Sequence, residues 1–150
     1  MKYIIGVGNY SMFDDSIGIK IVEHISENNL EDGFVAVDLS GNALNIFSYL
    51  CESTKKILLI DTVKEGIPPG EYRFFTPDRV TSEKELSQIT SHEGDMIKVL
   101  ELARQTGYHI PEIVIMGIGP AQIKMEYGLS PILKEKFNEF VENALIEIIN

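Results

Sequence analysis

The chain has 150 residues, and its 13 Lys and Arg against 23 Asp and Glu give a formal net charge of −10. Its length and globular composition predict one domain over residues 1–150. Acidity without a basic cluster excludes nucleic acid and anionic membranes as partners. No apolar run approaches the roughly 18 residues of a membrane span. No signal peptide is indicated, so we expect a cytoplasmic protein.

The first fifty residues alternate between strand and helix patterns. Residues 3–7 form a β-rich run, and apolar residues then recur at helical spacing over 17–25. A second strand is predicted over 34–37 and a second helix over 43–51. The only cysteine, Cys51, lies on the apolar face of that helix, so we expect it to be buried.

The middle of the chain contains a buried strand and a long polar segment. In the strand predicted over 56–60, every residue after Lys56 is apolar, which is typical of a strand covered on both faces of a parallel sheet, and Asp61 follows it. Glycines and prolines predict a turn over 66–70. An edge strand is predicted over 72–75, and the polar, aperiodic segment 76–91 is expected to be mobile and to contact a partner.

Two helices and a strand complete the pattern. Apolar residues between 96 and 103 define a third helix, with Gly107 as its C-terminal cap. A fifth strand is predicted over 113–118. Ser130 and Pro131 are typical of the start of a helix. The buried face of this terminal helix is predicted to comprise Leu133, Phe137, Phe140, Val141, Ala144, Leu145 and Ile148.

The order of elements predicts the architecture. Strands separated by helices imply right-handed crossovers and a mainly parallel sheet covered on both sides. We therefore expect an α/β fold, a three-layer sandwich in which helices cover both faces of a mainly parallel, twisted sheet. The sheet should have about five strands, one of them an antiparallel edge strand. Ligands of such sheets bind at the carboxyl ends of the strands, so the residues after each strand are the functional candidates.

The loop after the first strand resembles a dinucleotide-binding fingerprint only in part. Gly6 and Gly8 fit, but Ser11 occupies the third glycine position, and Asp14 and Asp15 would face a pyrophosphate. The chain has no phosphate-binding loop that ends in Lys-Ser or Lys-Thr, and no Gly-x-Ser-x-Gly elbow. Nucleotide binding and serine hydrolase chemistry are therefore disfavoured.

Three groups remain at the strand ends. Asp14 and Asp15 follow the first strand, Asp61 follows the third, and His92 lies in the segment 91–94 that opens the third helix. Two carboxylates and an imidazole would suit a divalent metal such as nickel or zinc. Each group also has a structural explanation. An Asp before a helix is often a cap or dipole partner, and a histidine there can bond to backbone. A carboxylate directly after a buried strand favours function.

Taken together, the motifs resemble the hydrogenase maturation endopeptidases. Residues 6–18, GVGNYSMFDDSIG, look like the N-terminal signature of that family. The resemblance covers nearly the whole chain in order. It continues through Asp38, Ser40-Gly41, Leu59-Ile60-Asp61, Pro68-Pro69-Gly70-Glu71, Ser91-His92, Gly117-Ile118-Gly119-Pro120 and Gly128-Leu129-Ser130-Pro131.

The resemblance implies a nickel-dependent endopeptidase. Such an enzyme removes a C-terminal extension from the precursor of a nickel-iron hydrogenase large subunit after nickel insertion. The resemblance implies that Asp15, Asp61 and His92 are the catalytic and metal-binding residues. It also implies that the nickel arrives with the precursor. Because two nearby carboxylates repel each other when no cation is bound, we expect the free enzyme to bind other divalent cations at high concentration.

Five residues near these positions are expected where the precursor approaches: Gly8, Asn9, Gly41, Asn42 and Gly94. Turn geometry alone is the other explanation for the glycines. The same three ligands would also serve a non-catalytic nickel-sensing or chaperone-like module that binds the immature subunit. They would equally serve a metal-dependent peptidase with an unrelated substrate. We expect a monomer, because the exposed helix faces are polar.

Overall fold

A five-stranded sheet forms the middle layer of the protein. The computed structural model describes residues 1–64, 66–79 and 91–150, and for residues 79 and 91–95 the backbone alone. The strands are β1 (Lys2–Gly6), β2 (Val35–Asp38), β3 (Lys56–Thr62), β4 (Tyr72–Phe75) and β5 (Glu112–Ile118). Their spatial order is β2-β1-β3-β5-β4. All neighbours are parallel except β4 and β5, which confirms the predicted antiparallel edge strand.

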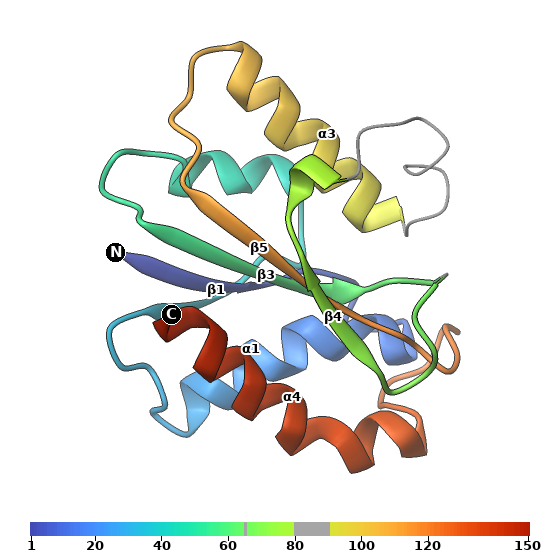
Figure 1. Ribbon diagram of the computed structural model, residues 1–150. Helices are drawn as coiled ribbons and strands as arrows, with labels where there is room; N and C mark the ends of the chain where they lie inside the picture. Colours follow the sequence, from blue (N-terminus) through green and yellow to red (C-terminus); the bar gives the residue numbers. More distant parts are fainter. Residues whose placement is uncertain (65, 80–90) are drawn as a thin grey trace.

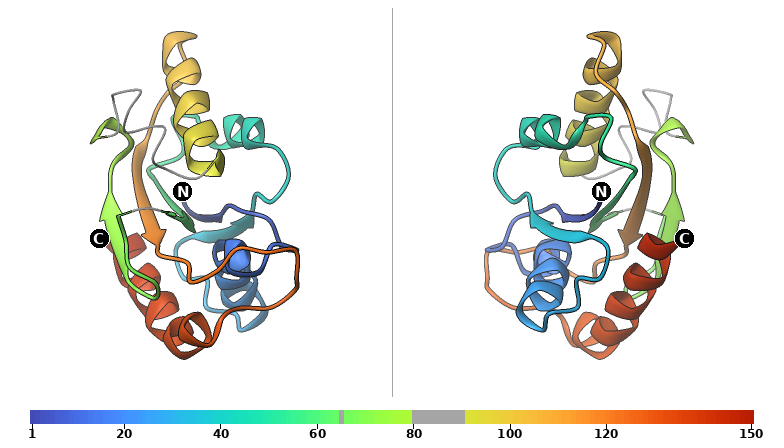
Figure 2. Two further views of the ribbon diagram at one scale, coloured as in Figure 1. Left: turned by 90° about the vertical axis from the view of Figure 1, so that its right-hand side faces the viewer. Right: turned by 90° about the vertical axis from the view of Figure 1, so that its left-hand side faces the viewer.

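Helices cover both faces of the sheet (Figure 1). On one face lie α1 (Ile17–Glu27) and α4 (Pro131–Ile149), and on the other lie α3 (Ser91–Gln105) and the 3₁₀ helix η2 (Ala43–Tyr49). Figure 2 shows the three layers from the side. Two shorter 3₁₀ turns are η1 (Phe13–Ser16) and η3 (Pro77–Arg79). The predicted three-layer sandwich is confirmed. Among the described residues, no helix combines the length and apolar character needed to cross a membrane.

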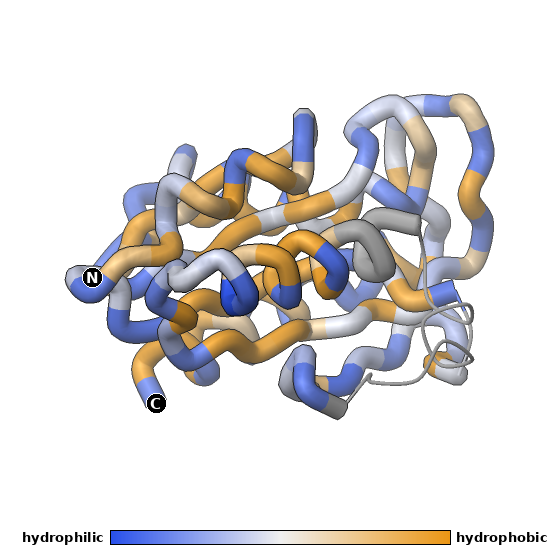
Figure 3. The backbone as a smooth tube through the Cα atoms, turned by 90° about the horizontal axis from the view of Figure 1, so that it is seen from above, coloured by the Kyte–Doolittle hydropathy of each residue, from blue (hydrophilic) through white to orange (hydrophobic). Residues whose placement is uncertain are grey.

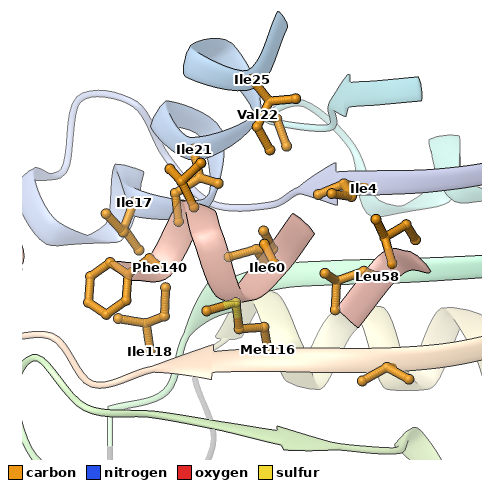
Figure 4. Packing of buried hydrophobic residues seen from close by; sticks show 14 of the residues in the cluster. Ile4, Ile17, Ile21, Val22, Ile25, Leu58, Ile60, Met116, Ile118 and Phe140 are labelled. Carbon is orange, nitrogen blue, oxygen red and sulfur yellow. The ribbon is translucent and has the colours of Figure 1, made fainter. Parts of the chain in front are cut away.

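Two hydrophobic clusters hold the layers together, one on each face of the sheet. Successive side chains of a strand point to opposite faces, so Ile4 and Ile60 meet Phe140 of α4 on one side (Figure 4). On the other side, Ile5 packs in a cluster with Met96 of α3. Hydrophobic segments accordingly run through the middle of the molecule, and hydrophilic residues gather at the turns (Figure 3). Each face thus has its own core.

The second predicted helix differs from expectation. It is a 3₁₀ helix with three residues per turn, so residues three apart share a face. Ile46 is fully buried, Ala43 and Tyr49 are half-buried, and Leu44 is 48% exposed. Cys51 is exposed, so the expectation that it would be buried was wrong. The helix ends at Tyr49, two residues before Cys51, so Cys51 does not lie on its buried face.

The terminal helix begins at Pro131, as predicted. Ser130 occupies the N-cap position, but its hydroxyl makes no capping hydrogen bond within the described part of the chain. At the other end, Nζ of Lys56 donates to the Glu147 carbonyl at 2.6 Å. This carbonyl lies in the last turn, where carbonyl groups have no hydrogen-bond partner within the helix. The predicted face is confirmed: Leu133, Phe140, Val141, Ala144 and Ile148 are buried, and Phe137 and Leu145 pack against them.

The remaining predictions concern the segment before α3 and the end of that helix. Gly107 has a φ of +89°, and the N–H of Tyr108 donates to the Ala103 carbonyl at 3.0 Å, which confirms the glycine cap. The polar segment 76–91 includes η3, and most of it lies outside the described residues. Its expected mobility and partner contact stay predictions.

Candidate functional site

Close packing of α1 on the sheet brings the first loop to the carboxyl ends of the strands. β1 and β3 are neighbours, with Gly6 opposite Ile60. A Cβ atom on Gly6 would lie 2.3 Å from the carbonyl oxygen of Gly18 in α1. A Cβ on Gly18 would lie 2.2 Å from the carbonyl oxygen of Ile60. Helix and strands therefore touch through their backbones, and the turn before the helix is placed beside the end of β3.

Thr62 donates hydrogen bonds to two buried carboxylates at this position, those of Asp15 and Asp61. Asp15 is 4% exposed and Asp61 2% exposed. The Thr62 hydroxyl donates to Oδ1 of Asp15 at 2.8 Å, and its N–H donates to Oδ1 of Asp61 at 2.7 Å. The N–H of Asn9 donates to Oδ2 of Asp15 at 3.2 Å. The carboxylates are thus oriented by hydrogen bonds before any ligand arrives.

Sequence reasoning missed the role of Thr62. Its signal was present, because a hydroxyl residue directly follows an apolar strand and a buried Asp. A buried hydroxyl needs a hydrogen-bond partner, and a carboxylate from another loop is one of few available at a strand end.

Gly8 lies between the two acidic residues. Its φ is +136°, and a Cβ there would lie 2.1 Å from the Asp15 carbonyl oxygen and 3.5 Å from Oδ1 of Asp61. Any side chain would therefore collide with the main chain of Asp15. Packing and backbone conformation both require glycine here. Local geometry therefore explains Gly8 without any role in the approach of the precursor.

Asp14 is the structural member of the acidic pair. Its carboxylate is fully buried. Oδ2 accepts the N–H groups of Ala121 and Gln122 at 2.9 and 3.1 Å, and Oδ1 accepts the N–H of Ser130 at 2.7 Å. It therefore fixes both ends of the loop between β5 and α4, and is not the cap of the helix that follows it. The neighbouring Asp15 is the carboxylate that shares Thr62 as a hydrogen-bond partner with Asp61.

The third predicted ligand, His92, lies in the first turn of α3. Figure 1 shows that this helix begins at the end of the molecule to which the parallel strands point. For His92 and Gly94 the structure describes the backbone alone, so the position of the imidazole and the surroundings of Gly94 lie outside the description. Their roles as ligand and substrate-approach residue stay predictions.

The donor set fits a divalent cation. Two carboxylates close together repel each other, and a cation between them relieves that repulsion. The position that a Cβ on Gly8 would take lies 3.5 Å from Oδ1 of Asp61, so the Gly8 backbone passes close to that carboxylate. Within the described side chains, no group of three His, Cys, Asp or Glu is arranged to hold a metal. A third ligand would therefore come from a side chain that the structure does not describe, and the imidazole of His92 is one of these.

A groove of about 540 Å³ opens at the same end of the sheet. Three of the five predicted substrate-approach residues line it, namely Gly8, Gly41 and Asn42, together with Lys98 and Val99 of α3. Within the described chain, the groove thus brings together residues of the loops after β1 and β2.

The fold explains the residue type at Asn42 but not at Gly41. Among the described residues, the nearest neighbour of a Cβ on Gly41 would be 3.9 Å away, and the φ of Gly41 is not positive, so neither packing within that part of the chain nor turn geometry requires a glycine there. Asn42 caps η2 by accepting the Leu44 N–H at 2.9 Å. Asn9 lies outside the lining of the groove, and its side chain accepts the Ser11 N–H at 3.0 Å.

Comparisons with known proteins show the family to which the chain belongs. A family model described as hydrogenase maturation protease matches residues 19–147. The chain is 26% identical over 147 residues to the hydrogenase expression/formation protein HupD of Thiocapsa roseopersicina, covering 95% of this chain and 65% of that protein. It is 22% identical over 143 residues to the hydrogenase 2 maturation protease of Escherichia coli K12, covering 95% and 87%.

The solved structure of the hydrogenase maturating endopeptidase HybD from Escherichia coli has the same fold. It superposes with a TM-score of 0.80 at 20% identity and covers 97% of this chain and 90% of its own. The family model spans most of the chain, and the resemblance of the sequence motifs is thereby confirmed. The protein belongs to the hydrogenase maturation protease family.

Proposed function

We propose that this protein is a nickel-dependent endopeptidase, which removes the C-terminal extension from the precursor of a nickel-iron hydrogenase large subunit after nickel insertion. The observation that carries the proposal is the pair of buried carboxylates, Asp15 and Asp61, beside Gly8, which lines the groove. The family supplies the reaction class, and the site supplies groups that can recognise a metal-loaded substrate.

Each residue of the candidate site has a role in this proposal. Asp15 and Asp61 hold the nickel that the precursor carries, with His92 as the third ligand. Nickel bound there would polarise the scissile carbonyl or lower the pKa of a water molecule. Thr62 keeps both carboxylates in place through its hydroxyl and its N–H. The groove at Gly41 admits the peptide, because nothing within the described residues crowds that backbone.

The deciding experiment incubates the purified protein with nickel-loaded and nickel-free precursor and determines the precursor's C-terminus by mass spectrometry. Loss of the extension from the nickel-loaded precursor alone is the expected result. Loss from both forms would contradict the nickel dependence. Loss from neither would contradict the peptidase and favour the non-catalytic binding module.

Variants locate the activity at the proposed site. Asp61→Asn and His92→Ala are expected to fold and to lower processing by about 100-fold or more, as loss of a ligand to a metal does. The matched control is Asp32→Asn, which changes an exposed carboxylate in the loop before β2 and should process normally. Normal processing by a folded double variant of Asp61 and His92 would contradict the assignment of these residues.

We further propose that the protein acts as a monomer in the cytoplasm. The polar outer face of α4, where Glu135, Glu139 and Glu142 are exposed, supports a helix that faces water. Sedimentation equilibrium of the purified protein tests the monomer, and a concentration-dependent dimer would contradict it.

A further inference from the structure

The loop between β5 and α4 exposes two apolar side chains next to the turn that carries Asp15. Met125 is 87% exposed and Tyr127 is 73% exposed, the two highest values among the large hydrophobic residues that the structure describes. Tyr10 is also exposed, and its ring centroid lies 6.2 Å from that of Tyr127. We refer to Tyr10, Met125 and Tyr127 as the loop patch.

The loop patch is held in place by the backbone. Asp14 binds both ends of the loop, as described above. In the middle of the loop, the carbonyl of Glu126 accepts the Phe13 N–H at 2.8 Å, and the Glu126 N–H donates to the Ser11 carbonyl at 3.0 Å. The loop therefore forms a short parallel bridge with the segment after β1. The exposure of Met125 and Tyr127 belongs to a loop that is fixed along its length.

Fixed apolar side chains in water favour a partner that covers them. Burial of their surface is favourable, and little conformational entropy is lost when the loop is already ordered. Tyr and Met are enriched at protein interfaces, and contiguous exposed apolar groups mark interaction sites. The loop patch has the composition and order of a docking surface.

Charge beside the patch indicates which kind of surface it fits. Nζ of Lys20 lies 4.5 Å from the centre of the Tyr10 ring, and Nζ of Lys124 lies 4.6 Å from the centre of the Phe13 ring. Lys124 also pairs with Glu126 at 3.5 Å. These three charges sum to a positive value in a chain of net charge −10. Carboxylates on the partner would complement them.

We propose that the loop patch docks a protein surface that is apolar at its centre and carries carboxylates at its rim. This inference rests on the proposed function, because it identifies the partner as the folded body of the large-subunit precursor. The patch is continuous with the proposed site. Tyr10 is two residues from Gly8, and the N–H of Asn9 between them donates to Asp15. A precursor whose tail enters the groove at Gly8 therefore covers the loop patch with its adjoining surface.

Binding to nickel-loaded precursor tests the inference, measured by biolayer interferometry in an Asp61→Asn background that prevents cleavage. Replacing Met125 and Tyr127 together with Ser is expected to raise Kd by about 10-fold or more, since exposed Tyr side chains at interface centres carry much of the binding energy. The matched control is Ile149→Ser, which removes a 69% exposed apolar side chain at the end of α4. This control should leave Kd within about 2-fold.

Processing assays separate this inference from the proposed function. With Asp61 intact, the Met125 and Tyr127 double variant should show a raised KM and an unchanged kcat, with an unchanged Tm as the check on folding. A double variant that binds and processes like the parent overturns the docking surface and leaves the peptidase standing. Parent protein that binds through the patch but cleaves nothing overturns the peptidase instead. Parent protein that does not bind the precursor overturns the docking surface.

Discussion

Replacing Asp14 with Asn tests how far one buried carboxylate stabilises the loop between β5 and α4. The native carboxylate accepts three N–H groups at 2.7–3.1 Å, two on Oδ2 and one on Oδ1. Asn has the same shape but only one oxygen. Whichever way the amide turns, its NH₂ group faces at least one buried backbone N–H, so donor meets donor.

The expected loss follows from this geometry. Each hydrogen bond to a charged group contributes about 1.5–3 kcal/mol, and a buried N–H left without its acceptor adds a desolvation cost. We therefore expect Asp14→Asn to lower the free energy of unfolding by about 3 kcal/mol. For a domain of this size that corresponds to a fall in Tm of roughly 6–12 °C. The control is Asp38→Asn, since Asp38 is exposed and accepts one N–H, that of Ser40 at 2.9 Å.

Urea unfolding followed by circular dichroism measures both variants, and hydrogen exchange shows where stability is lost. Asp38→Asn should cost less than about 1 kcal/mol. In Asp14→Asn, the amides of Ala121, Gln122 and Ser130 should exchange faster than in the parent. The reasoning is refuted if the two variants unfold within about 0.5 kcal/mol of each other with equal m-values, or if those three amides keep their protection.

Three further predictions concern single atoms. Gly6→Ala should lower the free energy of unfolding by about 2 kcal/mol or more, because its Cβ would lie 2.3 Å from a carbonyl oxygen of α1, whereas Gly41→Ala, with its nearest neighbour at 3.9 Å, should be neutral in urea unfolding. Thr62→Val removes the 2.8 Å hydrogen bond to the neighbouring carboxylate and should lower kcat for precursor processing by about 10-fold in a folded protein; an unchanged kcat would contradict the positioning role. Hydrogen bonds with the hydroxyl of Ser53 and, to a smaller extent, with that of Thr54 lower the pKa of the exposed Cys51 thiol. Iodoacetamide at pH 7.5 should therefore modify Cys51 faster in the native protein than in urea. Slower modification of the native protein would contradict this.

The sheet could be predicted from sequence because continuous apolar strands have few solutions. Residues 57–60 and 113–118 contain no polar side chain, which is typical of strands covered on both faces. These segments became β3 and β5 at the centre of the sheet. The 43–51 segment was harder, because choosing between 3.0 and 3.6 residues per turn depends on packing against α3.

The site was predictable where local sequence determines it. Asp61 ends a buried strand, and its location at the carboxyl end followed from that strand alone. Local sequence did not show that Asp14 is structural whereas Asp15 belongs to the candidate site. The groups that Asp14 binds lie 107 to 116 residues away along the chain, and no local pattern encodes them. The hydrogen bond from Thr62 to Asp15 likewise joins residues that are 47 positions apart, one in β3 and one in η1.

The contact between Gly6 and Gly18 has a consequence for how this site can change over time or by design. The spacing between the Asp15 turn and Asp61 is set by main-chain atoms that touch directly, since no side chain separates α1 from β1 and β3 there. Exchanging one core isoleucine for another apolar residue can therefore alter stability without altering the distance between the carboxylates. Core side chains can therefore vary while the geometry of the site is kept, provided that residues 6 and 18 both remain glycine.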